Sequence, residues 1–267
     1  MVIDFHTHVF PDELAPKAKA RLEANIDYLY TPCHDMTLKG LIQHMDKSGV
    51  DISVVQPVIT RPSQFKSVND FSASINNGRI VAFGAVHPET DDYKRDIDYI
   101  VSLGLKGIKF HPEYQSFILD DIKMLRVFDY AVSRGLILLF HAGYDPAMQP
   151  PYKSNPQRFA NLIKELKGGT IVAAHYGGQE QWDDVERYLA GTDIYLDTSM
   201  ALNAMDKAQF VRIFKAHGAD KVLFASDSPW GDPGKDIATI NNLPLTEEEK
   251  EKVFWKNSAL LLGINND

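Results

Sequence analysis

The sequence predicts an α/β protein with the architecture of a (β/α)8 TIM barrel. Short apolar runs of strand type recur along the 267 residues and alternate with longer segments of helical periodicity, a pattern that indicates βαβ units and a parallel sheet. Eight such runs occur, and the chain length is ordinary for one barrel domain. We therefore predict a single domain that covers residues 1–267.

The predicted strands are short and rich in β-branched, leucine and phenylalanine residues. They comprise residues 2–5, 52–56, 80–86, 107–110, 136–140, 170–174, 194–196 and 222–225. The predicted helices have apolar residues at helical spacing, and several end at a glycine suited to a left-handed cap. They comprise residues 38–47, 64–75, 93–103, 121–134, 156–166, 181–189, 207–217 and 246–262. The last begins with Thr246 three residues before Glu249, which predicts a capping box.

The connection after the first strand is longer than the others. It covers residues 9–37 and contains an extra predicted helix at 13–24. A loop that follows a barrel strand lies on the face where the active site forms. We therefore expect this insertion to line or cover a pocket.

Composition excludes several classes of partner. The formal charge is −8, from 28 basic and 36 acidic side chains, so the chain has no general positive field for a nucleic acid. One cysteine, Cys33, cannot form an intrachain disulfide, and no apolar run approaches the roughly 18 residues of a membrane span. We predict a cytoplasmic protein with a small-molecule substrate and no membrane or nucleic-acid partner. A homodimer is compatible with the sequence, although no interface signature is visible.

Polar side chains follow the predicted strands at the end where a barrel builds its site. His6 and His8 lie two residues apart on the first strand, so strand alternation places both on one face. The remaining strand-end residues are Lys109, His111, His141, His175 and Asp227. Because the carboxyl ends of barrel strands converge, we expect all of these side chains at one mouth. By contrast, we assign His34, His44 and His217, in a loop and on helices, to surface or helix-end roles.

Four short motifs resemble the amidohydrolase superfamily. They are residues 4–8 (DFHTH), 140–143 (FHAG), 174–178 (AHYGG) and 225–229 (ASDSP), and residues 257–262 resemble the superfamily's closing helix. The most similar branch is amidohydrolase-2, which contains aminocarboxymuconate-semialdehyde decarboxylase. The resemblance implies that His6, His8, His141 and Asp227 hold a metal, with zinc at one ion per chain expected and manganese or a second metal as alternatives. It also implies that His175 is catalytic or a ligand of the second metal.

The predicted reaction is hydrolysis by metal-activated water of a C–N or lactone C–O bond. A divalent metal lowers the pKa of bound water to about 7, Asp227 can accept and return the proton, and His175 can polarise a carbonyl. The alternative is a nonoxidative decarboxylase or hydratase, a lyase, acting on an unsaturated carboxylic acid. One barrel hosts many chemistries, so the fold does not separate these predictions. A nuclease ranks lower, because the fourth strand lacks the glutamate of that group, as does a metal-binding protein without activity.

Lys109 and His111 share one face of the fourth strand and leave two alternatives open. A carboxylated Lys109 would bridge two metals and favour hydrolysis. An ammonium would accompany one metal and, with His111, bind an anionic group of the substrate. Arg61 is a candidate second contact to a substrate carboxylate, and Trp230, Tyr114 and Tyr144 are candidate pocket walls.

Overall fold

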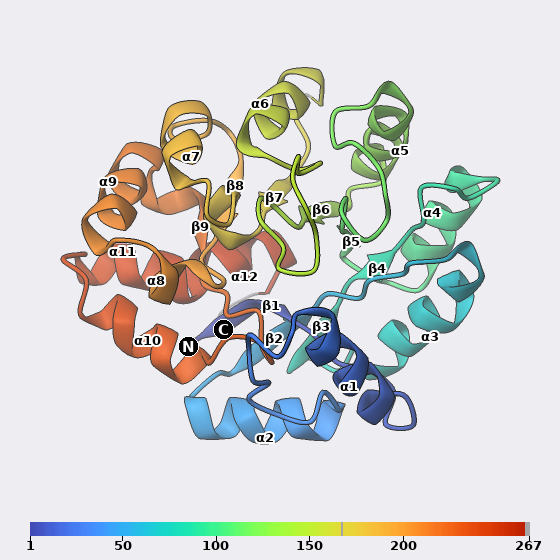
Figure 1. Ribbon diagram of the computed structural model, residues 1–267, viewed down its shortest axis with the longest axis horizontal. Coiled ribbons are helices and arrows are strands. Elements are labelled where there is room, and N and C mark those ends of the chain that lie inside the picture. Colours follow the sequence, from blue (N-terminus) through green and yellow to red (C-terminus); the bar gives the residue numbers. More distant parts are fainter. Residues whose placement is uncertain (167, 265–267) are drawn as a thin grey trace.

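The computed structural model describes residues 1–166 and 168–264, and it is a ring of parallel strands inside a ring of helices (Figure 1). The strands pair in the orders β1-β2-β3 and β4-β5-β6-β7-β8-β9, always with parallel neighbours. They are β1 Ile3–Thr7, β2 Ile52–Val55, β3 Ile80–Ala82, β4 Gly84–Ala85, β5 Gly107–Phe110, β6 Ile137–Phe140, β7 Ile171–Ala173, β8 Tyr195–Asp197 and β9 Val222–Leu223.

Backbone hydrogen bonds at two places join the two sheets into a closed barrel. β3 and β4 are parts of the one predicted strand 80–86, interrupted at Phe83, whose N–H still donates to Val55 O at 3.0 Å. On the other side, Phe5 N–H donates to Phe224 O at 2.9 Å, which joins β1 to the chain after β9. The predicted (β/α)8 barrel is confirmed. The predicted domain of residues 1–267 includes residues 265–267, which lie outside the described residues.

The helices surround the barrel as the predicted alternation requires, with additional short elements. They are α1 Ala15–Asn25, α2 Leu38–Ser48, η1 Pro62–Gln64, α3 Phe65–Ile75, α4 Tyr93–Ser102, α5 Ile122–Ser133, α6 Pro156–Glu165, η2 His175–Gly177, α7 Trp182–Tyr188, α8 Ala201–Ala204, α9 Lys207–His217, η3 Ala219–Lys221, α10 Pro233–Asn241, α11 Glu247–Glu251, η4 Lys252–Lys256 and α12 Asn257–Leu262. The sequence did not predict α8 and α10. The predicted helix 246–262 is α11, a π-helical turn (η4) and α12 in succession, and its capping box between Thr246 and Glu249 is confirmed.

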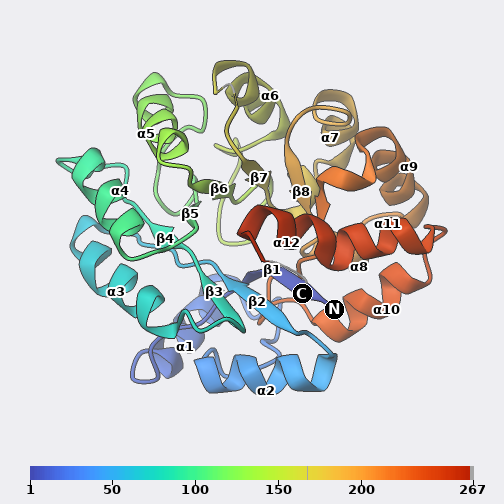
Figure 2. The same cartoon turned by 180° about the vertical axis from the view of Figure 1, so that it is seen from behind.

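Two apolar clusters form the core. The outer one packs strand side chains such as Ile108 and Phe110 against helix side chains such as Met45 and Phe128. The inner one combines alternate strand residues, including Phe5 and Leu139, with Ala259 and Leu262 of α12. In the view from behind, α12 crosses the barrel end opposite the strands' carboxyl ends (Figure 2). Apolar packing therefore fills that end and leaves the other to polar residues. None of the described helices is long and apolar enough to cross a membrane.

Candidate active site

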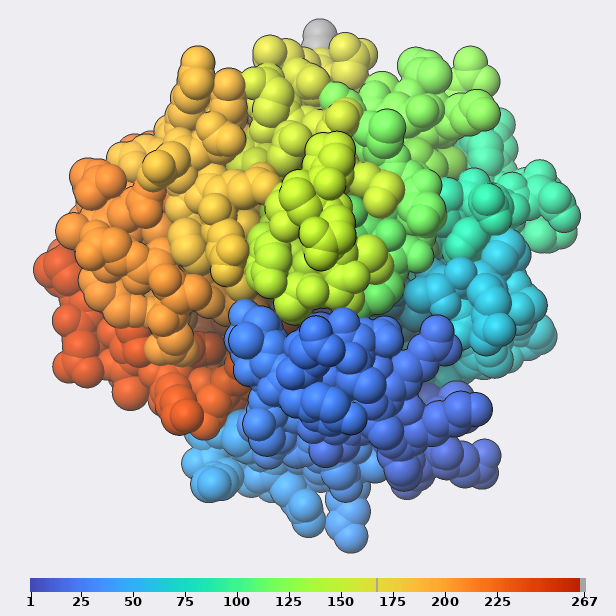
Figure 3. Space-filling model, in the orientation of Figure 1, coloured from blue at the N-terminus to red at the C-terminus, as the bar shows by residue number. Residues whose placement is uncertain are grey.

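The carboxyl ends of the strands are covered by two loop segments. The insertion after β1 and the segment between β6 and α6 meet over the barrel centre (Figure 3). The Tyr30 phenol of the insertion is half-buried, and burial together with the nearby charges of Glu180, Asp227 and Asp145 raises its pKa. The insertion thus covers the site, as the sequence predicted.

A bulge in β1 aims His6 into the site. Ile3 and Phe5 belong to the inner cluster, so strict alternation would turn His6 outward. Between Asp4 and Thr7 the chain advances three residues while β2 advances two, from Ser53 to Val55. Such an extra residue changes which face the following side chains occupy. Phe5 and His6 therefore both lie on the inner side, and His8 follows two residues later.

His6, His8 and Asp227, hereafter the convergent group, place their ligand atoms within 4.8 Å of one another. His8 Nδ1 donates to the carbonyl of Gln56 at 2.7 Å, which leaves the lone pair on Nε2. His6 Nδ1 lies 2.9 Å from a carboxyl oxygen of Asp197, which likewise assigns the proton to Nδ1. Both free Nε2 atoms face Asp227 Oδ1, at 2.9 Å from His8 and 3.4 Å from His6.

These contacts fit a bound cation. Two lone pairs facing a carboxylate oxygen repel one another unless a positive charge or a proton lies between them. Bonds of about 2.0–2.2 Å to one ion separate neighbouring ligand atoms by about 2.8 to 3.6 Å, from octahedral to tetrahedral angles, and both observed distances lie in this range. A positive group already faces one lone pair, because Lys109 Nζ lies 2.9 Å from His6 Nε2. Burial lowers the pKa of this lysine to about 8.

His175 connects the convergent group to His141. Its Nε2 lies 3.0 Å from His141 Nδ1, and its Nδ1 lies 2.9 Å from Ser199 Oγ. Asp197 holds the same loop, since its Oδ1 accepts the backbone N–H groups of His175 and Ser199. His175 and Asp227 have φ values of 55° and 63°, a region that residues other than glycine rarely adopt. Two of the predicted functional side chains are therefore held in strained backbone conformations.

His141 is buried beside His175, and its Nε2 has no hydrogen-bond partner in the described chain. Buried imidazole nitrogens normally have partners, so such an atom points to an ion or a water. Gly143, just after His141, has φ +84°, and a Cβ there would lie 2.4 Å from Gln179 N. Only glycine permits this close approach between the loops that follow β6 and β7.

His111, His141 and Asp145, hereafter the stacked group, lie on the other side of His175. His111 Nδ1 accepts the N–H of Tyr114 at 3.3 Å, and its Nε2 lies 3.4 Å from Asp145 Oδ2. The rings of His111 and His141 are stacked, with centroids 4.2 Å apart and planes inclined by 10°. A metal lies near the plane of each imidazole that binds it, and parallel rings have no common point in both planes. The stacked group therefore does not converge on one ion, although its ligand atoms lie within 4.8 Å of one another.

The sequence also matches a known protein family. An amidohydrolase family model matches residues 3–264. The chain belongs to the amidohydrolase family. No curated protein gives a significant sequence match.

Solved structures share the fold of this amidohydrolase at low identity. An uncharacterised TIM-barrel protein from Bordetella bronchiseptica has a TM-score of 0.79 at 17% identity, covering 98% of each chain. The 5-carboxyvanillate decarboxylase from Sphingomonas paucimobilis has a TM-score of 0.76 at 16% identity, covering 99% of each chain. A dihydroxybenzoic acid decarboxylase from Polaromonas sp. JS666, solved with manganese and 2-nitroresorcinol, has a TM-score of 0.72 at 15% identity, covering 100% of this chain and 98% of the other. Other neighbours include further decarboxylases and one probable 2-pyrone-4,6-dicarboxylic acid hydrolase.

The structure also locates the predicted substrate contacts of the amidohydrolase. Arg61 is exposed and lines a pocket of about 400 Å³ together with Arg21 of α1 and Tyr114. The Tyr114 ring lies against His111, with centroids 4.4 Å apart, so this pocket borders the stacked group. Trp230 is half-buried, and its backbone N–H donates to the backbone carbonyl of Asp227 at 2.8 Å in the turn after that residue.

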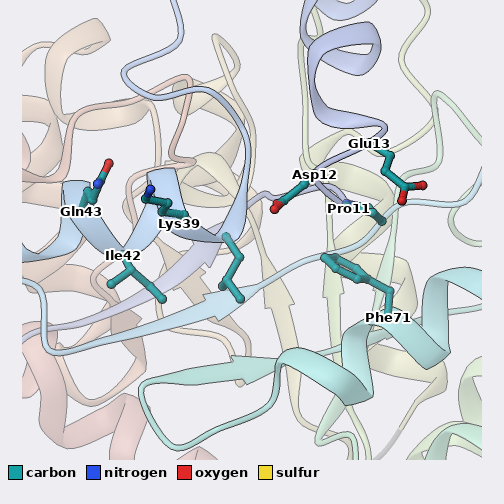
Figure 4. Close-up of a pocket in the computed structure, with 8 residues that line it drawn as sticks. Pro11, Asp12, Glu13, Lys39, Ile42, Gln43 and Phe71 are labelled. Atoms are coloured by element: carbon teal, nitrogen blue, oxygen red, sulfur yellow. The ribbon is translucent and has the colours of Figure 1, made fainter.

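A larger surface pocket of about 670 Å³ lies away from these residues. It is formed by residues just after β1 and by side chains of α2 and α3, including Asp12, Lys39, Ile42 and Phe71 (Figure 4). It contains none of the predicted site residues. Size alone therefore does not identify the site of this amidohydrolase.

Sequence reasoning missed Asp197, Ser199 and Asp145. Asp197 is the last residue of β8, so it carries the same strand-end signal as the predicted residues. β8 is the seventh strand of the barrel, and the sequence predicted no site residue on it. The absence of a site residue on this strand could have led to Asp197. Asp145 and Ser199 lie in loops and carry no comparable signal.

Proposed function

We propose that this amidohydrolase is a metal-dependent enzyme for a small carboxylate-bearing molecule, and that its reaction is nonoxidative decarboxylation. The observation that carries the proposal is the convergent group, in which His6 and His8 turn their Nε2 lone pairs toward Asp227, with Lys109 Nζ beside that of His6. Such an arrangement holds a divalent cation in a buried polar site.

His6, His8 and Asp227 would hold the ion, and we propose His141, whose Nε2 is buried without a partner, as the fourth ligand. Zinc and manganese both suit mixed imidazole and carboxylate ligands, and the Polaromonas decarboxylase contains manganese. When bound, the ion supplies a positive charge that polarises an oxygen atom of the substrate. Asp197 and the Gln56 carbonyl would keep the two histidines in the ligating tautomer.

Decarboxylation is favoured over the hydrolysis that the sequence first suggested. Several solved structures with this fold are decarboxylases of carboxyvanillate or of dihydroxybenzoates. In such a reaction the bond from carbon to the carboxylate breaks, carbon dioxide leaves, and the carbon keeps the electron pair and takes a proton. Asp227 and His175 are the groups we propose for that proton transfer, because both point into the covered mouth.

Cationic side chains support an anionic substrate. Lys109, as an ammonium, would attract a carboxylate at the convergent group. No carboxylate in the described chain forms an ion pair with Arg21 or Arg61 at the rim pocket, whereas five other arginines have acidic partners: Arg79, Arg95, Arg134, Arg158 and Arg212. We propose that Arg61 at the rim pocket, together with His111 and Trp230, contacts the part of the substrate remote from the metal.

Hydrolysis remains the second candidate, because Lys109 offers a route to a two-metal site. Burial lowers its pKa to about 8, and a neutral amine is the form that adds carbon dioxide to become a carbamate. A carbamate beside His6 would supply the bridging oxygens of a second metal.

Isotope labelling tests the proposal directly. The zinc- and manganese-loaded enzymes are offered aromatic and unsaturated carboxylic acids and, separately, lactones and amides, in D2O and in water labelled with 18O. Decarboxylation predicts carbon dioxide release and one deuterium on the carbon that carried the carboxylate. Incorporation of 18O into the product without carbon dioxide release would instead establish hydrolysis. Asp227→Asn and His175→Asn should lose either activity, and near-normal turnover with unchanged metal content would overturn the assigned roles.

A further inference from the structure

The hydroxyl group of Ser199 joins two neighbouring strands at the barrel mouth. Asp197 is the last residue of β8, and His175 follows β7, which pairs with β8 (Figure 1). Ser199 Oγ donates to Asp197 Oδ1 and lies 2.9 Å from His175 Nδ1. His175 in turn places its Nε2 3.0 Å from His141 Nδ1. All four residues are buried, so bulk water does not compete for these atoms.

The Asp197 carboxylate determines where the protons of this series lie. Its Oδ1 accepts the Ser199 hydroxyl and the backbone N–H groups of Ser199 and His175, and its Oδ2 accepts from His6 Nδ1. An ionised carboxylate can only accept, so the single hydroxyl proton of Ser199 points to Asp197. Ser199 therefore has no proton to donate to His175. Its oxygen must accept from His175 Nδ1, which means that this nitrogen carries a proton.

The tautomer of His141 follows from that of His175. Burial lowers the pKa of both imidazoles well below its ordinary value, so each ring is neutral and carries one proton. With its proton on Nδ1, His175 has a lone pair on Nε2, and the 3.0 Å contact requires His141 Nδ1 to donate. The lone pair of His141 is then on Nε2, the buried atom without a partner in the described chain.

Four other histidines of the described chain have the opposite tautomer. Each accepts a backbone N–H at its Nδ1, at 3.0 to 3.3 Å, and so carries its proton on Nε2; they are His34, His87, His111 and His217. The sequence assigned surface or helix-end roles to His34 and His217, but His217 is buried and His34 is half-buried. The Nε2–H form also predominates in water. The Nδ1–H form of His175 and His141 therefore requires a specific cause, and Ser199 supplies it.

We propose that Ser199 is a positioning residue that transmits the orientation set by Asp197 to His175 and, through His175, to His141. Both rings thereby keep the lone pair on Nε2. For His141 this is the form in which Nε2 can bind a metal, and for His175 it is the form in which Nε2 can take up a proton. Asp197 would orient His6 directly and the other two imidazoles through Ser199. The consequence for metal binding rests on the proposed function, whereas the positions of the ring protons do not.

Nitrogen-15 NMR of the metal-free protein, labelled on histidine, shows which ring nitrogen carries the proton. Signals of His175 and His141 are assigned by their loss in His175→Asn and His141→Asn. In the wild type we expect both rings in the Nδ1–H form, with His34 and His217 in the Nε2–H form as internal references. Ser199→Ala removes the acceptor of His175 Nδ1, so the Nε2–H form should become the major form of both His175 and His141.

Thr198→Ala is the matched control. Thr198 is the buried neighbour of Ser199, and its hydroxyl bonds to the backbone carbonyl and N–H of Ala225, so its loss should leave both tautomers unchanged. The inference is overturned if either ring of the wild type is in the Nε2–H form, if Ser199→Ala leaves both rings unchanged, or if Thr198→Ala changes them equally. Should Ser199→Ala not fold, Ser199→Cys keeps the side-chain size with a much weaker acceptor and carries the same expectation.

Zinc affinity separates this inference from the proposed function. Ser199→Ala removes the lone pair from His141 Nε2, so zinc affinity should fall about 10- to 100-fold, measured by competition with a chromophoric chelator, while Thr198→Ala keeps the wild-type affinity. A wild type that binds no zinc but shows the expected tautomers would contradict the proposed function and support the role of Ser199. Unchanged zinc affinity in Ser199→Ala would overturn the part of that role that concerns His141.

Discussion

Two histidine and aspartate groups share the barrel mouth, and they differ in where their lone pairs point. In the convergent group, the Nδ1 atom of each imidazole donates to an acceptor, so the Nε2 lone pairs of His6 and His8 both point toward Asp227. In the stacked group, His111 lies face to face on His141 and turns its Nε2 toward Asp145. Ligand identity and spacing are similar in both. The orientation of the rings gives one group a metal-binding geometry and the other a hydrogen-bonding geometry.

The largest effect should follow from removing the carboxylate that both Nε2 atoms of the convergent group face. Asp227→Asn removes the negative charge that both Nε2 atoms face, so bound metal should fall below a tenth of the wild-type content and turnover by about 10³-fold or more. Metal analysis and initial rates measure this. The matched change in the stacked group is Asp145→Asn, and this variant should keep the metal bound at the convergent group. Equal metal loss in both variants would mean that the two groups do not differ in the way proposed.

The next effect concerns Asp197, whose carboxylate accepts the hydrogen bond from His6 Nδ1. Asp197→Asn replaces the acceptor of His6 Nδ1 with an amide that can present its NH2 group instead. Orienting partners of this kind are worth about 10- to 100-fold in metal affinity. A chelator competition titration should show a loss in that range, with a cooperative unfolding transition retained. Unchanged affinity would show that the His6 tautomer is fixed by another contact.

Asp145→Asn should have a smaller effect, on turnover alone. Losing the 3.4 Å contact between His111 Nε2 and the Asp145 carboxylate should cost at most about 1.4 kcal/mol, which corresponds to roughly 10-fold in rate if His111 must be oriented for the substrate. Steady-state kinetics on the substrate found by the isotope screen would measure it. A variant with wild-type turnover would assign the stacked group a purely structural role.

The smallest effect is on stability and concerns Lys109, which faces the convergent group. Burial lowers its folded-state pKa to about 8, below its value of about 10.4 in an unfolded chain. Between these values the unfolded chain binds more protons, so this residue makes the metal-free protein more stable as the pH rises from about 8 toward 10. Lys109→Met should remove that contribution. Urea unfolding with chelator at pH 7.5 and 9.5 gives the change in unfolding free energy between the two pH values for wild type and variant. The same change in both proteins would argue against the lowered pKa.

The sequence was sufficient for the barrel and for much of the site, because both depend on local patterns. Strand-length apolar runs gave the sheet, and the polar residues that end them gave His141, His175 and Asp227. The bulge in β1 was not predictable, since it depends on the register with β2. Nor was the Asp197 contact to His6, which joins residues 191 positions apart. α10 was missed because Pro233 and Gly234 at its start are typical of a turn.

The convergent group lies across the line where the barrel closes. His6 and His8 come from β1, while Asp227 follows β9, and Asp227 N–H donates to His6 O at 2.9 Å across this line. The three proposed ligands come from the two ends of the barrel sequence, so a nascent chain that lacks the last strand has no complete metal site. The proposed ion would therefore bind only after the final strand has docked, as one of the last events of maturation. In a cell, the ion would then favour chains whose barrel has closed.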